Sequence, residues 1–195
     1  YPPLTEWTLP YWGKHTCNLL VGNVTLIGEG PGETELVLGG TTGEAGIIAY
    51  GTTTIRDMSI DYGGLVGMLG VWGDIKVCGV QTYSGQQYSY AVAMINWNAG
   101  AHTLDISNCL FSHWAGEGTG VYLETCASDG SSSIMATIEN TVITGWEYGV
   151  NWTTWDNCGA INVDAECDDI TGNAEGNVLE DDTVSGQEVE YCSGK

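Results

Sequence analysis

The chain has 195 residues, and its 25 acidic and four basic side chains give a formal net charge of −21 at pH 7. This length suits a single domain with a continuous hydrophobic core. The charge argues against nucleic-acid binding and against contact with anionic membranes, because no cationic surface is available to displace counterions. No apolar run reaches the roughly 18 residues that a membrane-spanning helix needs, so we expect no direct membrane insertion.

Short β-branched segments bounded by Gly, Asn, Asp and Ser run along the chain, and long apolar periods of 3.6 residues are missing. Residues 1–19 are rich in Trp and Pro and show no repeated frame, so we expect an N-terminal cap or docking segment there. Residues 20–173 carry a repeat and form the predicted body. Residues 174–195 are acidic and are expected to be a C-terminal tail or cap.

The repeat is clearest where Ile106-Ser-Asn-Cys-Leu-Phe-Ser-His-Trp114 aligns with Ile138-Glu-Asn-Thr-Val-Ile-Thr-Gly-Trp146, at an offset of 32 residues (138 − 106). Residues 75–80 and 55–60 fit the same frame, and a looser copy begins near Val163. A second strand is expected after the two clearest copies, at 120–125 and 149–154, with shorter candidates at 46–50 and 91–95. Repeats of this kind are the signature of a solenoid, because one coil cannot bury its apolar face alone.

The coil length varies, which argues against leucine-rich or ankyrin arrays, whose repeats hold a fixed length. We therefore predict an all-β fold, a right-handed parallel β-helix with irregular N- and C-terminal segments that are partly anchored by disulfides. Stacking at about 4.8 Å then places equivalent side chains above one another. The frame predicts an amide ladder of Asn108 and Asn140 at a bend, and three inward ladders: Ile55, Ile75, Ile106 and Ile138; Ile60, Val80, Phe111 and Ile143; Met58, Cys78, Cys109 and Thr141.

The segment Val24-Thr-Leu-Ile-Gly-Glu-Gly-Pro-Gly-Glu-Thr34 resembles the first coil of pectate-lyase-like and pectin-esterase-like β-helices. The copies that begin at Ile106 and Ile138 resemble the general right-handed β-helix repeat. The resemblance covers residues 20–173 and implies the fold, but this fold hosts unrelated activities.

No catalytic motif is complete. Lyase chemistry needs a strong base, and the chain offers only four basic residues, of which Arg56 and Lys76 are expected to form a structural charge ladder. The pair Asp168-Asp169 is similar to that of polygalacturonase-type enzymes, whose Gly-His-Gly and Arg-Ile-Lys motifs are missing here. Ser112, His113 and Asp105 are close in sequence, but no Gly-x-Ser-x-Gly turn accompanies them. We therefore expect that the protein is not an enzyme.

Four carboxylates lie close together near the end of the repeat. Hard oxygen ligands suit Ca²⁺, but the spacing does not match an EF-hand loop, and a solvated acidic face is the alternative interpretation. No other cofactor is indicated. The candidate Ca²⁺ ligands are Asp164, Glu166, Asp168 and Asp169.

Seven cysteines are scattered without Cys-x-x-Cys spacing, which suits an oxidising compartment and predicts an extracellular or cell-surface location. Cys126 and Cys158 end equivalent strands and are a candidate bridge between adjacent coils. Cys17 and Cys192 are candidates for anchoring the terminal segments or linking subunits, and Cys167 is a further candidate. Cys78 and Cys109 share an inward position in the frame, so we expect them to be buried thiols.

Surface recognition has two kinds of candidate. The sequons Asn23-Val-Thr and Asn151-Trp-Thr are candidate glycosylation sites. Trp114 and Trp146 share a frame position, and Tyr83 lies close to it one coil earlier, so an outer aromatic stripe is predicted. Such a stripe contacts glycans or a neighbouring subunit, unless the rings pack as loops against the solenoid wall.

Rigidity, acidity, cysteines and aromatic residues favour a structural role. The leading hypothesis is a subunit of an extracellular assembly (a sheath, surface layer, filament or virion appendage) that self-associates into a polymer or lattice. The alternative is a carbohydrate-active β-helix, either a glycan-binding spike or adhesin domain or a relative of polysaccharide lyases and hydrolases.

Overall fold

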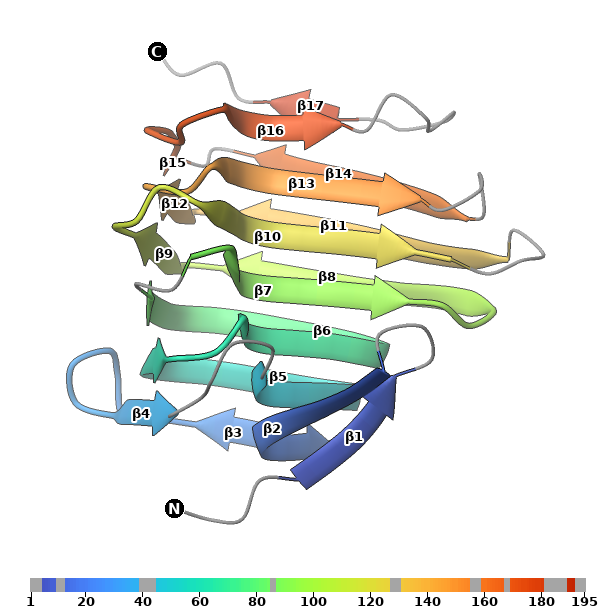
Figure 1. Cartoon of the computed structure of the whole chain (residues 1–195), viewed down its shortest axis with the longest axis horizontal. Coiled ribbons are helices and arrows are strands. Elements are labelled where there is room, and N and C mark those ends of the chain that lie inside the picture. Colours follow the sequence, from blue (N-terminus) through green and yellow to red (C-terminus); the bar gives the residue numbers. More distant parts are fainter. Residues whose placement is uncertain are drawn as a thin grey trace.

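The computed structural model describes residues 5–9, 13–38, 45–84, 87–126, 131–154, 159–166, 169–180 and 189–191. Every regular element within these ranges is a β-strand, and the strands stack in successive layers along one axis (Figure 1). No helix in this part of the chain has the length and apolarity to cross a membrane. The strands are β1 (Thr5–Leu9), β2 (Gly13–Gly22), β3 (Thr25–Ile27), β4 (Glu35–Leu38), β5 (Ala45–Tyr62), β6 (Val66–Ser84), β7 (Ser89–Asn96), β8 (Gly100–Ser107), β9 (Leu110–His113), β10 (Gly118–Thr125), β11 (Ser132–Glu139), β12 (Val142–Thr144), β13 (Tyr148–Thr154), β14 (Ala160–Glu166), β15 (Asp169–Ile170), β16 (Gly176–Glu180) and β17 (Val189–Tyr191).

The chain winds as a parallel β-solenoid with three faces, which confirms the predicted fold class. The front sheet contains β2, β7, β10, β13 and β16, the back sheet contains β3, β8, β11, β14 and β17, and the side sheet contains β4, β9, β12 and β15. The long strands β5 and β6 turn two corners each and contribute a segment to all three sheets. The pairing of β1 with β2 is antiparallel.

A left-handed residue makes the bend between the back and side sheets in each of four successive coils. Asp57, Gly79, Asn108 and Asn140 have φ angles of 59°, 62°, 54° and 48°. Asn, Asp and Gly are the residues that adopt this conformation most readily, so the same corner recurs with the same small set of residue types. The predicted bend at Asn108 and Asn140 is confirmed, and the backbone N–H of Asn108 donates to the Glu139 carbonyl at 3.0 Å across it. The ladder of side-chain amides remains a prediction.

The central prediction of the repeat is also confirmed, because Ile106 and Ile138 are direct partners in a parallel pairing. Ile55, however, pairs with Val77 rather than with Ile75, and Val77 pairs with Ile106. Placing Ile75 in this ladder was therefore wrong by two residues. A slip of two residues keeps every side chain on its own face of the sheet, so the apolar pattern cannot detect it. Within the described residues, the ladder runs through Leu26, Ile55, Val77, Ile106, Ile138, Ala165 and Tyr191.

The same two-residue shift in register applies to the other two predicted ladders. Thr82, not Val80, lies between Ile60 and Phe111, and Val80 pairs with Met58 instead. In the third ladder Cys78 is replaced by Val80, whose amide donates to Cys109 Sγ at 3.5 Å.

Cys78 therefore lies in an outward row, between Arg56 and Ser107, and is only half-buried. Calling it a buried thiol was wrong, whereas Cys109 is buried as predicted. Arg56 and Lys76 do not form a charge ladder, because the Cα partner of Lys76 is Thr54, two residues before Arg56.

The solenoid is longer than the predicted body. It begins with β2, which pairs in parallel with β5, and it continues beyond residue 173 through β16 and β17. The expected terminal segments thus contribute strands to the stack, although the side chains of residues 5–9 and 13–16 are not described.

Large side chains fill the interior because one row of the front sheet is made of small residues. A Cβ at Gly120 would lie 2.3 Å from Ile143 Cγ2, and one at Gly67 would lie 2.8 Å from the Tyr62 ring. Burying one such apolar side chain contributes roughly 1.5–3 kcal/mol. The row consists of Gly46, Gly67, Ala91, Gly120 and Gly149.

Candidate functional site

The fold does not assemble the residues that sequence proximity suggested for nucleophilic catalysis. The Ser112 hydroxyl donates to the Thr82 carbonyl at 3.4 Å. Asp105 lies on β8, where Lys76 is its Cα partner in the coil before. His113 is buried and contacts a serine that precedes it by 24 residues, so these residues do not act together.

That serine is Ser89. The buried Ser89–His113 pair resembles a catalytic dyad in composition, but its hydrogen bonds do not suit activation of the serine. Ser89 Oγ lies 3.2 Å from His113 Nε2, and the Ala115 amide donates to His113 Nδ1 at 3.2 Å. A neutral imidazole whose Nδ1 accepts a hydrogen bond carries its proton on Nε2, which then donates a hydrogen bond to Ser89. The ring cannot take the hydroxyl proton in this state, as activation of a serine nucleophile requires. The pair is therefore structural.

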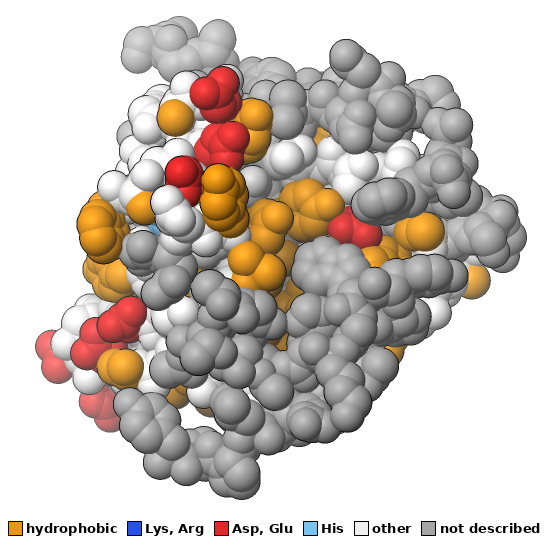
Figure 2. Space-filling model, in the orientation of Figure 1, with side chains coloured by type: hydrophobic (Ala, Val, Ile, Leu, Met, Phe, Trp, Pro, Cys, Tyr) orange, Lys and Arg blue, Asp and Glu red, His pale blue; other side chains and the backbone are white. Residues whose placement is uncertain are grey.

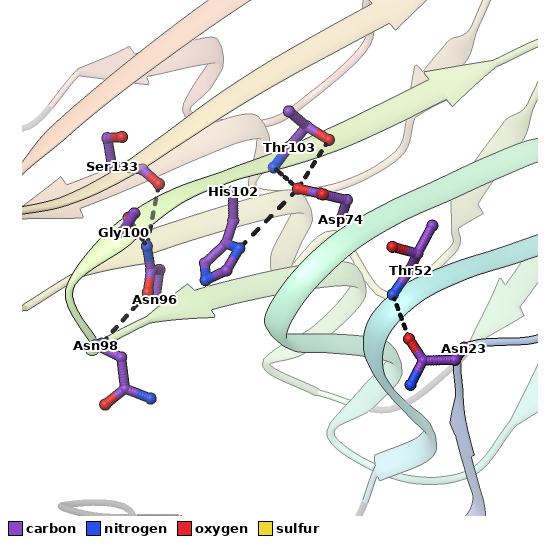
Figure 3. A network of polar contacts seen from close by, with 9 residues as sticks. All are labelled: Asn23, Thr52, Asp74, Asn96, Asn98, Gly100, His102, Thr103 and Ser133. Carbon is purple, nitrogen blue, oxygen red and sulfur yellow. Dashed lines mark hydrogen bonds and ion pairs between the residues drawn. The ribbon is translucent and has the colours of Figure 1, made fainter.

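A surface network ties the corner of β6 to the coil above it (Figure 3). Asp74 Oδ1 accepts the Thr103 amide at 3.0 Å and the Thr103 hydroxyl at 3.3 Å, and it lies 4.0 Å from His102 Nδ1. These groups satisfy one carboxylate oxygen and fix the start of β8 against β6.

Asn96 links two adjacent coils on the same side of the solenoid through its buried side chain. Its side-chain amide donates to the Gly100 carbonyl at 2.9 Å and to the Ser133 carbonyl at 3.0 Å, which belong to adjacent coils (Figure 3). Since Asn96 is fully buried, this amide replaces backbone pairing at a corner and sets the spacing between the coils.

The structure describes only one side chain of the predicted Ca²⁺ site. Asp164 is exposed on β14, the side chains of Glu166 and Asp169 are not described, and Asp168 lies outside the described residues. Among the residues that the structure describes, no group of three or more His, Cys, Asp or Glu side chains is arranged to hold a metal ion. The Ca²⁺ site remains a prediction.

The predicted disulfides involve residues that the structure does not describe. Cys158, Cys167 and Cys192 lie outside the described ranges. Cys17 is buried on β2, and Cys126 follows β10, where its amide donates to the Asn96 carbonyl at 3.1 Å. No disulfide joins two of the four described cysteines. The bridges that pair Cys17 or Cys126 with a second cysteine therefore remain predictions.

The two sequons differ in their surroundings. Asn23 is exposed at the corner after β2, with φ of 55°, and its Oδ1 accepts the Thr52 amide at 3.2 Å (Figure 3). Asn151 is half-buried within β13. The fold thus presents Asn23 more openly than Asn151.

The predicted outer aromatic stripe is wrong for Trp146, which is completely buried. Its indole Nε1 donates to the Phe111 carbonyl at 3.2 Å, and its ring stacks on His113 with centroids 4.5 Å apart. The residue before Trp146 is Gly145, whose φ of 81° turns the chain. The residue before Trp114, at the aligned position, is His113. Trp114 and Tyr83 do lie at the surface, with 83% and 42% of their areas exposed.

A second apolar cluster lies on the outer face of the front sheet, which sequence reasoning did not foresee. Ile48, Leu69 and Ala93 are fully buried there, outside the solenoid interior. Figure 2 shows hydrophobic and acidic side chains on this side of the molecule, and no Lys or Arg among the described side chains in view. The half-buried aromatic residues that pack against the cluster are Tyr50, Trp72, Tyr90, Trp97 and Tyr122.

A buried carboxylate organises these aromatic residues. Glu124 accepts the Trp97 indole N–H and the Tyr122 hydroxyl, each at 2.9 Å. Tyr90 packs on Tyr122 with ring centroids 5.1 Å apart. Burial raises the pKa of Tyr90, and the charges of Glu124 and Glu147 raise it further. Glu124 is thus a positioning residue with both oxygens engaged.

The first coil presents an open edge. Among the described residues, β3 and β4 pair only with β5, so their other sides have no neighbouring strand. The Val24 carbonyl and the Gly28 amide bond to β5, and along a parallel strand alternate residues face the same neighbour. The backbone groups of Thr25 and Ile27 therefore point away from β5, on the side where no described strand pairs with β3. The Thr34 carbonyl accepts from Ser59 on β5 and the Leu38 carbonyl accepts from Gly63 directly after it, so the backbone groups of Glu35 and Val37 point away from β5 in the same manner.

Apolar side chains accompany these unpaired backbone groups. Leu26 and Leu36 pack against the core but are only partly buried, and Val24, Ile27 and Val37 are exposed. An edge with exposed apolar residues is a template for pairing with another chain. The exposed carboxylates Glu29, Glu33 and Glu35 lie along the same edge and oppose contact with another acidic surface at low ionic strength.

No protein-family model matches this chain, and no match is found among curated proteins or among solved structures.

Proposed function

We propose that the protein is a structural subunit of an extracellular or cell-surface assembly, such as a sheath, surface layer, filament or virion appendage. The observation that carries the proposal is the open edge of β3 and β4, where exposed apolar side chains accompany backbone groups that no other described strand pairs with.

The occupant that best fits this edge is a second copy of the chain. The interior ladders end at the edge with Leu26 and Leu36, so an arriving parallel strand with apolar inward residues extends the core. The other end of the solenoid offers such strands, since β15, β16 and β17 each pair on one side only within the described residues. Head-to-tail contact of this kind repeats without closing and produces filaments.

The charge of the chain sets the conditions for stacking. Copies with a formal charge of −21 repel one another, and the repulsion between exposed charges is screened over about 8 Å at physiological ionic strength. We therefore expect assembly to increase with salt. Intermolecular disulfides between terminal cysteines belong to the same proposal and predict that reductant weakens the polymer.

Light scattering after size-exclusion chromatography and negative-stain microscopy, across a salt series, test the proposal. Ile27→Lys and Val37→Lys place a charge on the edge without touching the interior, and each is expected to abolish assembly. Met135→Lys is the matched control, because Met135 on β11 is 54% exposed, as Ile27 is, but lies in the middle of the stack. A chain that stays monomeric at every salt concentration would disprove the assembly role. Polymers that Ile27→Lys and Met135→Lys affect equally would exclude this edge.

A further inference from the structure

Three exposed aromatic residues lie at the corner between the side sheet and the front sheet, and we call them the aromatic corner: Tyr83, Tyr88 and Trp114. Tyr83 lies near the end of β6, and its Cα partner is Ser112. Trp114 is two residues beyond Ser112 and directly follows β9, so it lies in the coil next to that of Tyr83. Tyr88 directly precedes Ser89, whose hydroxyl contacts His113, so Tyr88 and Trp114 flank the same contact.

A buried framework holds the corner in place. Ser89 Oγ lies 3.3 Å from Ser84 Oγ and 3.2 Å from His113 Nε2, which joins the turn after β6 to the end of β9. The Ala115 amide donates to the same imidazole, and Trp146 stacks on it. The rings therefore project from a fixed base, as a preorganised binding site requires.

Tyr88 adds a second, independent observation. Its φ of 56° is in the left-handed region, where a bulky side chain is strained and where Gly or Asn is usual. The residue is 62% exposed, so packing does not explain why a tyrosine stands there. Strained residues that persist at exposed positions cluster at ligand sites.

The chemistry of the corner selects the ligand. Tyr and Trp rings combine an apolar face with a polar edge, so they stack on the C–H face of a sugar ring while hydroxyls bond at the rim. The Tyr83 hydroxyl already donates to Gln81 Oε1 at 2.6 Å, which leaves its oxygen free to accept a hydrogen bond from a ligand hydroxyl.

The charge near the aromatic corner disfavours anionic polysaccharides. Gly118, the Cα partner of Ser89, donates its amide to a Glu147 carboxylate oxygen at 3.5 Å, so negative charge lies beside the corner. The described basic side chains are Arg56 and Lys76. Both belong to back-sheet pairings and not to the side and front sheets that form the aromatic corner. An anionic polysaccharide is repelled here, whereas a neutral glycan is not. We propose that the aromatic corner binds neutral glycans.

The direct test titrates cellohexaose, chitohexaose and mannohexaose by isothermal titration calorimetry, with hexagalacturonate as the anionic probe. We expect saturable binding of at least one neutral probe, with Kd near or below about 1 mM, and none of hexagalacturonate. Trp114→Ala and Tyr88→Ala are each expected to weaken binding about two- to tenfold, since a stacked ring contributes that much. Both variants should fold, because the rings are largely exposed.

Met135→Ala is the control, and it should bind like the parent protein because its exposed side chain lies elsewhere. Ile27→Lys, which blocks the open edge, should also keep full glycan affinity, so this site and the assembly role can fail separately. The inference is overturned if no neutral hexasaccharide binds, if hexagalacturonate binds best, or if Trp114→Ala leaves affinity unchanged. Loss of self-association in Trp114→Ala without glycan binding would instead identify the corner as a contact between copies.

Discussion

The register of the solenoid is open to a direct energetic test with double-mutant cycles. In the structure Val77 is the direct partner of Ile106, whereas the sequence frame alone pairs Ile75 with Ile106. All three side chains are buried, with exposed fractions of 0%, 1% and 2% for Val77, Ile106 and Ile75. Each truncation to Ala therefore lowers the free energy of unfolding, by about 2–5 kcal/mol for the isoleucines and somewhat less for the smaller valine.

The cycles separate the two registers because coupling depends on contact. Val77→Ala with Ile106→Ala should show an interaction energy of about 0.5–3 kcal/mol, since these residues touch and share any cavity. Ile75→Ala with Ile106→Ala should be additive to within about 0.5 kcal/mol, since Ile75 stacks on Leu104 instead. Urea denaturation followed by circular dichroism supplies the free energies, with Met135→Ala as a surface control. Stronger coupling for the Ile75 pair would refute the register.

Three further predictions address the bend, the small-residue row and the buried thiol. Asn108→Val should lower stability by about 1–2 kcal/mol, because a β-branched residue is disfavoured at φ of 54°, whereas Asn108→Gly should be nearly neutral; thermal unfolding distinguishes the two. Gly120→Ala should cost about 1–3 kcal/mol, because the new methyl group would lie 2.3 Å from Ile143 Cγ2, and a smaller cost of Gly120→Ala in the background of Ile143→Ala, which removes Cγ2, would confirm the cause. Burial raises the pKa of Cys109 from 9.0 to about 12, so its neutral form stabilises the fold. This contribution is complete below pH 9 and declines as the pH rises toward 12, by up to about 1.4 kcal/mol per pH unit, and Cys109→Ala should flatten that part of the stability profile. Native-state thiol labelling should modify the half-buried Cys78 before Cys109, and equal labelling rates would contradict the assigned positions.

The apolar and turn patterns were sufficient to predict the fold class and the stacking of Ile106 on Ile138. They also aligned the front-sheet strands β10 and β13, in which Val121 lies on Val150. These predictions succeed because the repeat places like residues at like positions over a nearly constant offset, and a buried ladder demands that likeness.

The pattern failed where the coils change length. Val77 and Ile106 are 29 residues apart (106 − 77), not the 31 that the frame implies between Ile75 and Ile106. Alternation repeats every two residues, so both registers bury the same faces, and only the left-handed corner at Gly79 and Asn108 distinguishes them.

The surface features depended on tertiary structure even more strongly. Trp114 and Trp146 occupy aligned positions, yet the turn at Gly145 takes one ring into the core and leaves the other in solvent. The contact between Ser89 and His113 links different coils, and no local signal announces it. Local sequence thus determined which residues prefer a strand, a bend or a buried face. The fold decided which coil each residue meets, because register is fixed by corner geometry and by how side chains fill the shared interior.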